Sequence, residues 1–216
     1  MYKILLILIA SFINTSLSAQ QVPTVQAVIE KYNQVLGGKE KLDSVKTSVV
    51  ESTLQIDGQE FSSITKKKGN KMLTEISFKG QVVNKVIFNG EKGYSVEMGV
   101  KTNLSVEKTR LLKKGNAYDA LNYESYAFEQ VNEEKIDGKT YFILSTNNNK
   151  FYFDKNTGLL YKLEVKGLQL VVSSYITVEG IKFPENTEMT ISGKVIPVKY
   201  YKILINTDIS DKEFQL

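Results

Sequence analysis

The chain has 216 residues, with 28 basic and 24 acidic side chains and with neither histidine nor cysteine. Lacking both residue types, it cannot build a Ser-His-Asp triad, a Cys-His pair, a disulfide, or a zinc site based on imidazole or thiolate. The net charge of +4 is too small to indicate a nucleic-acid partner.

The N-terminal segment has the layout of a secretory signal peptide. Lys3 precedes the apolar run Ile4–Ile9, and small residues follow as far as Ala19. We predict that residues 1–19 are the signal, that cleavage occurs near Ala19, and that the product is periplasmic or secreted. A membrane anchor is the alternative, but the apolar run is shorter than the roughly 20 residues that span a bilayer. Without a cysteine for lipid attachment, no membrane anchor is expected after cleavage.

Residues 20–216 are expected to form a single domain, because a chain of this size can bury about 70% of its extended surface in one core. Its first element is an amphipathic helix with Thr24 as N-cap, followed by apolar residues at helical spacing as far as Leu36. Gly37 or Gly38 supplies the C-cap, and a short second helix follows at Lys39–Val45. This helix pair is suited to lie against a flat surface.

From Thr47 onward the hydrophobic period is two, which predicts strands. Asp57-Gly58, Lys79-Gly80 and Asp137-Gly138 are hairpin turn signals. We predict ten or eleven strands in an antiparallel meander. They include the segments that end at Ile56 and Phe88, and those at Met72–Phe78, Phe128–Ile136, Thr140–Thr146, Phe151–Phe153, Tyr161–Val165, Leu168–Thr177, Ile181–Phe183, Thr187–Ser192 and Val195–Asn206.

One long segment interrupts the strands, at Ser105–Tyr123. Its pattern predicts two short helices hinged at Gly115-Asn116. A long insertion between strands is often a lid, and an ordinary surface crossover is an equal alternative.

The remaining polar motifs do not indicate a reaction. Glu133 and Glu134 are the only adjacent carboxylates, and neighbours on a strand point to opposite faces. Asp154–Gly158 starts like a calcium loop but lacks its later glycine and glutamate, so it is interpreted as a turn. The basic run Lys66–Lys68 is interpreted as a solvated strand edge. No cofactor, metal or catalytic residue is expected.

The strands instead supply many apolar side chains that alternation places on one face. Any one of them can be plain core, but a sheet of this many strands must curl, and the helix pair is a small filler for its concave side. Either the insertion fills the rest or an apolar cleft remains. The candidate cavity-lining residues are Leu54, Ile56, Met72, Ile76, Phe78, Phe151, Phe153, Tyr161, Leu163, Val165, Met189 and Ile191.

Several stretches resemble the outer-membrane lipoprotein-sorting (LolA/LolB-like) superfamily. They are LGGKEKLDSVKT, FNGEKGY, YFDKNTGLLYKLE and GIKFPENTEM, and the similarity extends from Val25 to Leu216. The resemblance implies an α+β, mostly antiparallel fold: an unclosed half-barrel wrapped around the N-terminal helix and the short helical insertion, with an apolar cavity for acyl chains.

The function that this resemblance implies is non-catalytic. The leading hypothesis is a soluble envelope protein that carries a lipid or an acylated protein. The second is an envelope scaffold whose cavity is filled by its own helices and which works through a protein partner. A carboxylate-only enzyme is the third.

Overall fold

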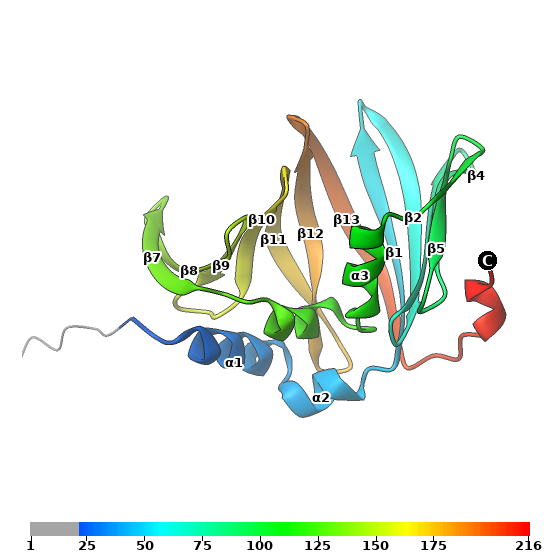
Figure 1. The fold of residues 1–216 in the computed structure, drawn as a ribbon. Helices are drawn as coiled ribbons and strands as arrows, with labels where there is room; N and C mark the ends of the chain where they lie inside the picture. The colour runs from blue at the N-terminus through cyan, green and yellow to red at the C-terminus, as the bar shows by residue number, and fades with distance from the viewer. Residues whose placement is uncertain (1–21) are drawn as a thin grey trace, which may run out of the picture.

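The computed structural model describes residues 22–216, apart from the side chains of residues 121, 124 and 125. The predicted signal peptide therefore lies outside the described residues. A curved antiparallel sheet dominates the molecule (Figure 1). Its strands are β1 (Thr47–Ile56), β2 (Gln59–Lys68), β3 (Lys71–Phe78), β4 (Gln81–Phe88), β5 (Gly93–Glu97), β6 (Val100–Asn103), β7 (Gln130–Ile136), β8 (Lys139–Ser145), β9 (Asn149–Asp154), β10 (Leu160–Val165), β11 (Leu168–Val178), β12 (Ile181–Ile191) and β13 (Lys194–Ile205).

The helical elements are α1 (Val25–Leu36), α2 (Lys39–Ser44), α3 (Val106–Lys113), and the short 3-10 helices η1 (Asp119–Ser125) and η2 (Asp211–Phe214). The Thr24 hydroxyl accepts a hydrogen bond from the Ala27 amide, as expected of an N-cap. Gly37 caps the far end of α1 with φ of 142°. α3 and η1 confirm the expected pair of helices around Gly115-Asn116.

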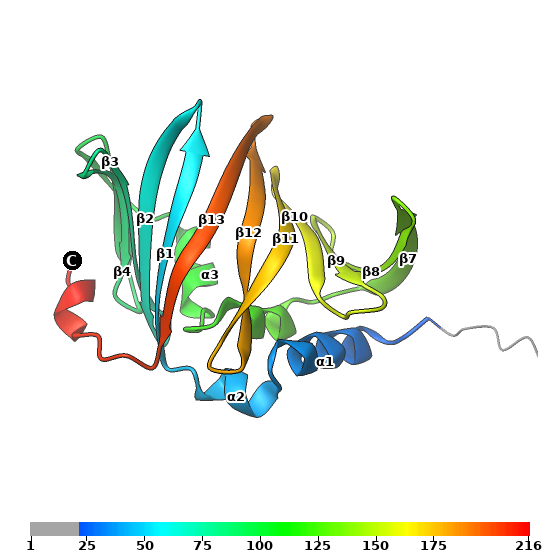
Figure 2. The ribbon, with the colours of Figure 1, turned by 180° about the vertical axis from the view of Figure 1, so that it is seen from behind.

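The strand order shows how the chain makes one open sheet. It runs β6-β5-β4-β3-β2-β1-β13-β12-β11-β10-β9-β8-β7, so β1 pairs with the last strand and β6 and β7 are the two edges. The chain must therefore travel from one edge to the other between β6 and β7. Residues 104–129, which we call the crossover, make this connection over the concave face of the sheet (Figures 1 and 2).

This arrangement confirms the predicted open, mostly antiparallel half-barrel, with thirteen strands in place of ten or eleven. The extra strands include β5 and β6; β6 is exposed along its whole length, which gives it no alternating pattern. β12 is continuous from Ile181 to Ile191, where the sequence predicted two separate strands, Ile181–Phe183 and Thr187–Ser192. Pro184 lies where the register with β11 shifts, a site at which a missing amide costs little.

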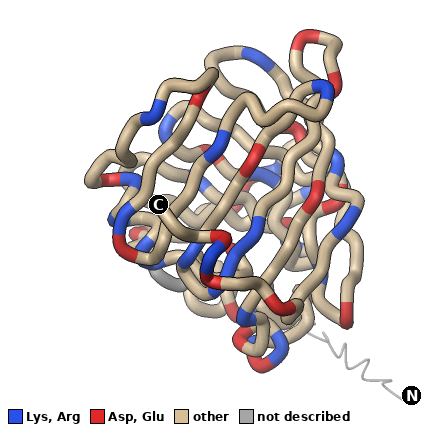
Figure 3. The backbone as a smooth tube through the Cα atoms, turned by 90° about the vertical axis from the view of Figure 1, so that its right-hand side faces the viewer, with Lys and Arg blue, Asp and Glu red and all other residues tan. Residues whose placement is uncertain are grey.

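Apolar packing occurs on both faces of the sheet. The largest cluster joins α1 and α2 to the concave face of β8–β13 and includes Leu36, Leu42, Phe151 and Phe153. A second cluster lies on the opposite face, where Phe214 of η2 covers strands β1, β3 and β4. Basic and acidic positions crowd together beside this C-terminal segment (Figure 3).

Candidate ligand cavity

A cavity of about 480 Å³ lies between the crossover and the concave face of the sheet. We call it the central cavity. Strands from both halves of the sheet contribute to its wall, and α1 contributes one side chain. It is lined by Tyr32, Ser48, Val50, Thr65, Lys67, Met72, Thr74, Ala117, Tyr118, Asp119, Ala120, Tyr123, Leu160, Leu163, Leu170, Val172, Phe183, Pro184, Tyr200 and Ile203.

Strand register explains the wall formed by β1, β2 and β3. Directly paired residues in an antiparallel sheet point to the same face. Val50, Thr65 and Thr74 are paired in this way, and all three line the cavity. Val49 is the neighbour of Val50 on β1, so alternation requires its side chain to point to the opposite, convex face. Val49 indeed packs in the cluster under η2.

The crossover forms one wall of the cavity and is held in place by hydrogen bonds to two distant strands. The buried Ser48 hydroxyl donates to the carbonyl oxygen of Ala117 at 2.7 Å. The Tyr118 hydroxyl donates to the carbonyl oxygen of Lys182 on β12. Ala117, Tyr118 and Ala120 are buried, so this part of the crossover is a packed wall of the cavity.

A group of tyrosines adds phenolic hydroxyl groups to a lining that combines aliphatic side chains with a few other polar ones. Burial is the main cause that raises the pKa of Tyr32 and Tyr123 well above the ordinary value, and the nearby Tyr175 raises both further. Burial also raises the pKa of Tyr118 and Tyr200. These phenols therefore stay neutral and can donate hydrogen bonds across the physiological range of pH.

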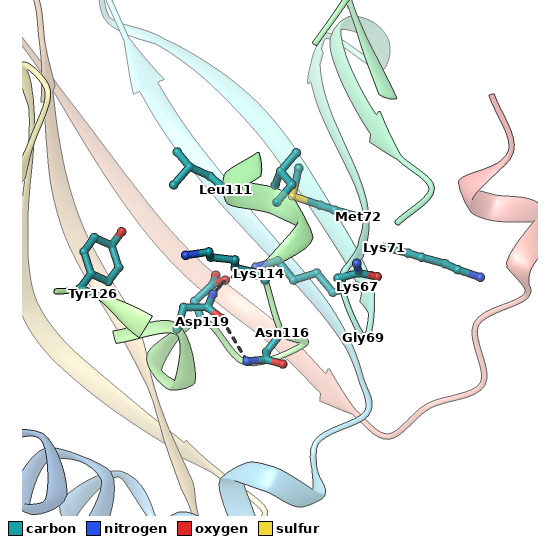
Figure 4. A pocket seen from close by; sticks show the side chains of 13 residues that line it. Lys67, Gly69, Lys71, Met72, Leu111, Lys114, Asn116, Asp119 and Tyr126 are labelled. Carbon is teal, nitrogen blue, oxygen red and sulfur yellow. Dashed lines mark hydrogen bonds and ion pairs between the residues drawn. The ribbon is translucent and has the colours of Figure 1, made fainter. Parts of the chain in front are cut away.

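A second hollow, of about 250 Å³, adjoins the central cavity beside α3 (Figure 4). We call it the α3 pocket. It shares three lining residues with the central cavity, namely Lys67, Met72 and Asp119. Its lining is Lys67, Gly69, Asn70, Lys71, Met72, Leu111, Leu112, Lys114, Gly115, Asn116, Asp119, Asn122 and Tyr126.

An ion pair between Lys67 and Asp119 stands at the junction of the two hollows. The Lys67 side chain is only 14% exposed, whereas that of Asp119 is 70% exposed. An ammonium group removed from water needs an anionic or hydrogen-bonding partner, which Asp119 provides. Because Asp119 belongs to η1, the pair ties the crossover to β2.

The basic run Lys66–Lys68 is divided between the two faces of the sheet. Lys67 points inward to Asp119, while Lys66 pairs with Glu213 at 2.9 Å and Lys68 with Asp211 at 3.2 Å. The run thus connects β2 to the crossover on one face and to the C-terminal segment on the other. Its interpretation as a purely solvated edge is corrected by these contacts.

The predicted lining residues are distributed over several environments. Met72 and Leu163 line the central cavity. Leu54 and Phe78 both pair with Phe61, so these side chains point to one face of the sheet. Ile56 and Ile76 lie two residues from Leu54 and Phe78 and, by alternation, point to the same face. Met189 pairs with the cavity residue Leu170, and Ile191, paired with Leu168, is 41% exposed.

The other predicted residues pack against the protein itself. Phe151 and Phe153 are fully buried, and the rings of Tyr123 and Tyr32 lie 5.1 Å from them, respectively. Val165 packs at the edge of the same cluster. Tyr161 departs from its expected inward direction: it stacks on Tyr141, with ring centroids 4.7 Å apart, because the register shifts between Leu160 and Lys162. A contact between any of the twelve residues and a ligand stays a prediction.

Sequence reasoning missed the polar lining of the cavity. Tyr32 fits the apolar stripe of the first predicted helix, Tyr118 fits the second short helix of the insertion, and Lys67 fits the basic run, while no pattern marks Asp119 or Tyr200. Alternation along β2 could have placed Lys67 on the same face as Thr65, but its partner lies 52 residues further along the chain. Among residues 22–216, no group of carboxylates is arranged to hold a metal ion.

Comparison with known proteins identifies the fold. No protein-family model and no curated protein matches the sequence. A LolA superfamily protein from Nitrosomonas europaea superposes with a TM-score of 0.61 at 17% identity, over 90% of this chain and 98% of its own. The chain has a LolA-like fold. A DUF1329 family protein from Desulfovibrio piger gives a TM-score of 0.58 at 14% identity, over 89% of this chain and 97% of its own.

The LolA-like fold confirms the architecture that the sequence resemblance implied. At these identities the likeness establishes the fold, and the ligand must be argued from this chain's own cavity. In the part of the chain that the structure describes, no helix has the length and apolar character required to cross a membrane.

Proposed function

We propose that this protein is a non-catalytic carrier of an apolar ligand, a lipid or the acyl chains of a lipoprotein, in the cell envelope. The observation that carries the proposal is the central cavity of about 480 Å³ between the crossover and the sheet. Pockets for small organic ligands typically measure roughly 300–1,000 Å³ and combine apolar walls with a few polar groups. The lining of this cavity has that composition.

The energetics of acyl binding suit a carrier. Each methylene group buried contributes about 0.8 kcal/mol, so affinity grows with the length of chain that the cavity accepts. Association itself costs roughly 4–15 kcal/mol, which leaves a moderate net affinity and allows the ligand to be released. The signal-like N-terminus and the LolA-like fold support an envelope location.

A scaffold function is the second candidate, and one observation favours it. The concave face of β8 and β9 is filled by the protein's own side chains: Phe151 contacts the rings of Tyr123, Tyr126 and Phe128 at centroid distances of 5.1–5.3 Å. If the crossover closed the remaining cavity equally well, the molecule would act through its surface alone. Ligand uptake separates the two functions.

The test blocks the cavity with tryptophan, a bulky residue type that the natural chain lacks. Leu170→Trp would place a large side chain in the central cavity, and Gln169→Trp would place the same side chain on the opposite face of β11. Uptake of a fluorescent apolar probe such as N-phenylnaphthylamine should be strong in the natural protein, weak in Leu170→Trp and unchanged in Gln169→Trp. Equal uptake by the two folded variants would contradict a carrier that uses this cavity.

Native mass spectrometry of the purified protein, followed by lipid extraction, would identify the cargo. A stoichiometric lipid or acylated peptide supports the carrier. An unliganded mass, together with failure to take up added fatty acid or lipopeptide, would favour the scaffold.

A further inference from the structure

The α3 pocket differs in charge from the central cavity that it adjoins. Three lysines, Lys67, Lys71 and Lys114, line it against a single carboxylate, that of Asp119. Lys71 is paired with Asp211 at 3.0 Å and points away toward the C-terminal segment (Figure 4). Lys67 and Lys114 therefore set the charge inside the pocket.

Lys114 is the uncompensated cation of this pair. Within the part of the chain that the structure describes, no carboxylate pairs with it. Figure 4 shows its side chain extending across the pocket in the direction of Tyr126 rather than back toward α3. Lys113, its neighbour, contributes only a backbone carbonyl oxygen nearby, which accepts from the Asn70 amide at 3.5 Å, and its side chain does not line the pocket.

Lys67 is held by a partner that can be exchanged. Its ammonium group is largely removed from water, whereas the Asp119 carboxylate is 70% exposed and lies on a short 3-10 helix. Another anion could take the place of Asp119 beside Lys67. The Lys67 ammonium group would then still have an anionic partner, and the Asp119 carboxylate would be hydrated by solvent. The Asn116 side chain lines the same pocket, where its amide donates to the side-chain oxygen of Asn122 at 3.1 Å.

The position of these cations relates them to the central cavity. Lys67 and Met72 line both hollows, so a chain that starts at Lys67 enters the cavity past Met72 without crossing the sheet or the crossover. One ligand could then place a polar end beside the lysines and an apolar end among Leu163, Leu170 and Val172. A molecule with two such ends is an amphiphile.

We propose that the α3 pocket binds the anionic head group, a carboxylate or a phosphate, of an amphiphile whose apolar chain occupies the central cavity. The proposal rests on the carrier function proposed above and specifies its ligand class. Lys114 and Lys67 are the head-group ligands, and the bound anion replaces Asp119 at Lys67. Since Asp119 ties η1 to β2, head-group binding also loosens one tie of the crossover.

Four probes with one alkyl chain test the head group: decanoate, decyl phosphate, decanol and decyltrimethylammonium. Isothermal titration calorimetry at low salt should show that at least one anionic probe binds about tenfold more tightly than decanol, as expected for a charge-assisted hydrogen bond. The tighter of the two anions would distinguish a carboxylate from a phosphate ligand. The cationic probe should bind most weakly.

Two adjacent lysines provide a matched pair of variants. Lys114→Gln should lose most of the preference for the anion over decanol while keeping its affinity for decanol, and Lys113→Gln should behave like the natural protein. Asp119→Asn should strengthen binding of the anionic probe, because it removes the competing carboxylate. Thermal unfolding of each variant, followed by circular dichroism, checks that the fold is intact.

The outcomes separate this proposal from the carrier function. Equal affinity for decanoate, decyl phosphate and decanol, a preference for the cation, or an equal loss in both lysine variants would overturn the head-group site and leave a carrier of neutral ligands. Weaker anion binding in Asp119→Asn would overturn the exchange at Lys67. If no probe binds, the carrier function and the head-group site both fail.

Discussion

The positions of single aromatic residues show what the alternation of apolar and polar residues along a strand can predict and what it cannot. Phe151 and Phe153 were expected to point inward, and they do, but they are fully buried under the protein's own α1 and crossover. The period of two assigns a residue to a face of the sheet. Whether that face is covered depends on the path of residues 104–129, which no local pattern records.

The burial of Phe153 predicts a large cost for its truncation. Phe153→Ala should lower the free energy of unfolding by about 3–5 kcal/mol, because it leaves a cavity beside Tyr32 in the largest core cluster. Urea denaturation followed by circular dichroism measures the change. Phe61→Ala is the comparison: Phe61 is half-buried and stacks on Phe78 at 4.8 Å, so its loss should cost only about 1–2 kcal/mol. Equal costs would contradict the assignment of Phe153 to the main core.

At the scale of elements, the break between α1 and α2 has a specific cause. The Gly37 amide donates to the carbonyl oxygen of Gln34, and a Cβ atom at position 37 would lie 2.6 Å from the carbonyl oxygen of Gly180. The helix therefore ends where its backbone touches the β11–β12 turn. The sequence predicted the C-cap correctly, but the contact partner lies more than 140 residues away and could not be inferred.

The two glycines at this break give a matched prediction. Gly37 and Gly38 both have positive φ, of 142° and 91°, so alanine at either site should cost about 1–3 kcal/mol of backbone strain. Only Gly37→Ala also meets the Gly180 carbonyl, since nothing lies within 4 Å of a Cβ at position 38. That clash should add about 1–3 kcal/mol to its cost. Thermal or urea unfolding of both variants measures the difference, and equal stability would refute the close approach.

For the whole molecule, the hydrophobic period and the turn signals predicted a curled antiparallel sheet, and the resemblance to the LolA/LolB-like superfamily implied that it is open, with helices on its concave side. Turn signals such as Asp57-Gly58 and Asp137-Gly138 predicted the hairpins that join neighbouring strands. Both pairs adopt the positive φ values of a tight hairpin turn. The junction of the two hollows could not be predicted, because Lys67 on β2 and Asp119 on the crossover meet only after the sheet has curved. Electrostatic partners far apart in sequence leave no periodic signal.

The buried tyrosines lead to a prediction about the molecule in alkaline solution. Burial raises the pKa of Tyr32, Tyr118, Tyr123 and Tyr175 above the ordinary value of about 10. Above that pH the unfolded chain loses phenolic protons that the folded chain retains. Stability is therefore complete below about pH 10 and falls as the pH rises further, toward the raised pKa values of the folded state.

We expect this loss to appear as a cooperative alkaline transition. Tyrosinate absorbance should rise in two phases, first from exposed phenols and then from the buried ones, and the second phase should coincide with the loss of circular dichroism. Tyr123→Phe should move the second phase to higher pH, because one buried phenol no longer favours the unfolded chain after deprotonation. If all tyrosines titrated together while the circular dichroism stayed constant, the phenols around the central cavity would be open to water. The cavity would then be a wet surface groove, and the case for an apolar ligand would lose its basis.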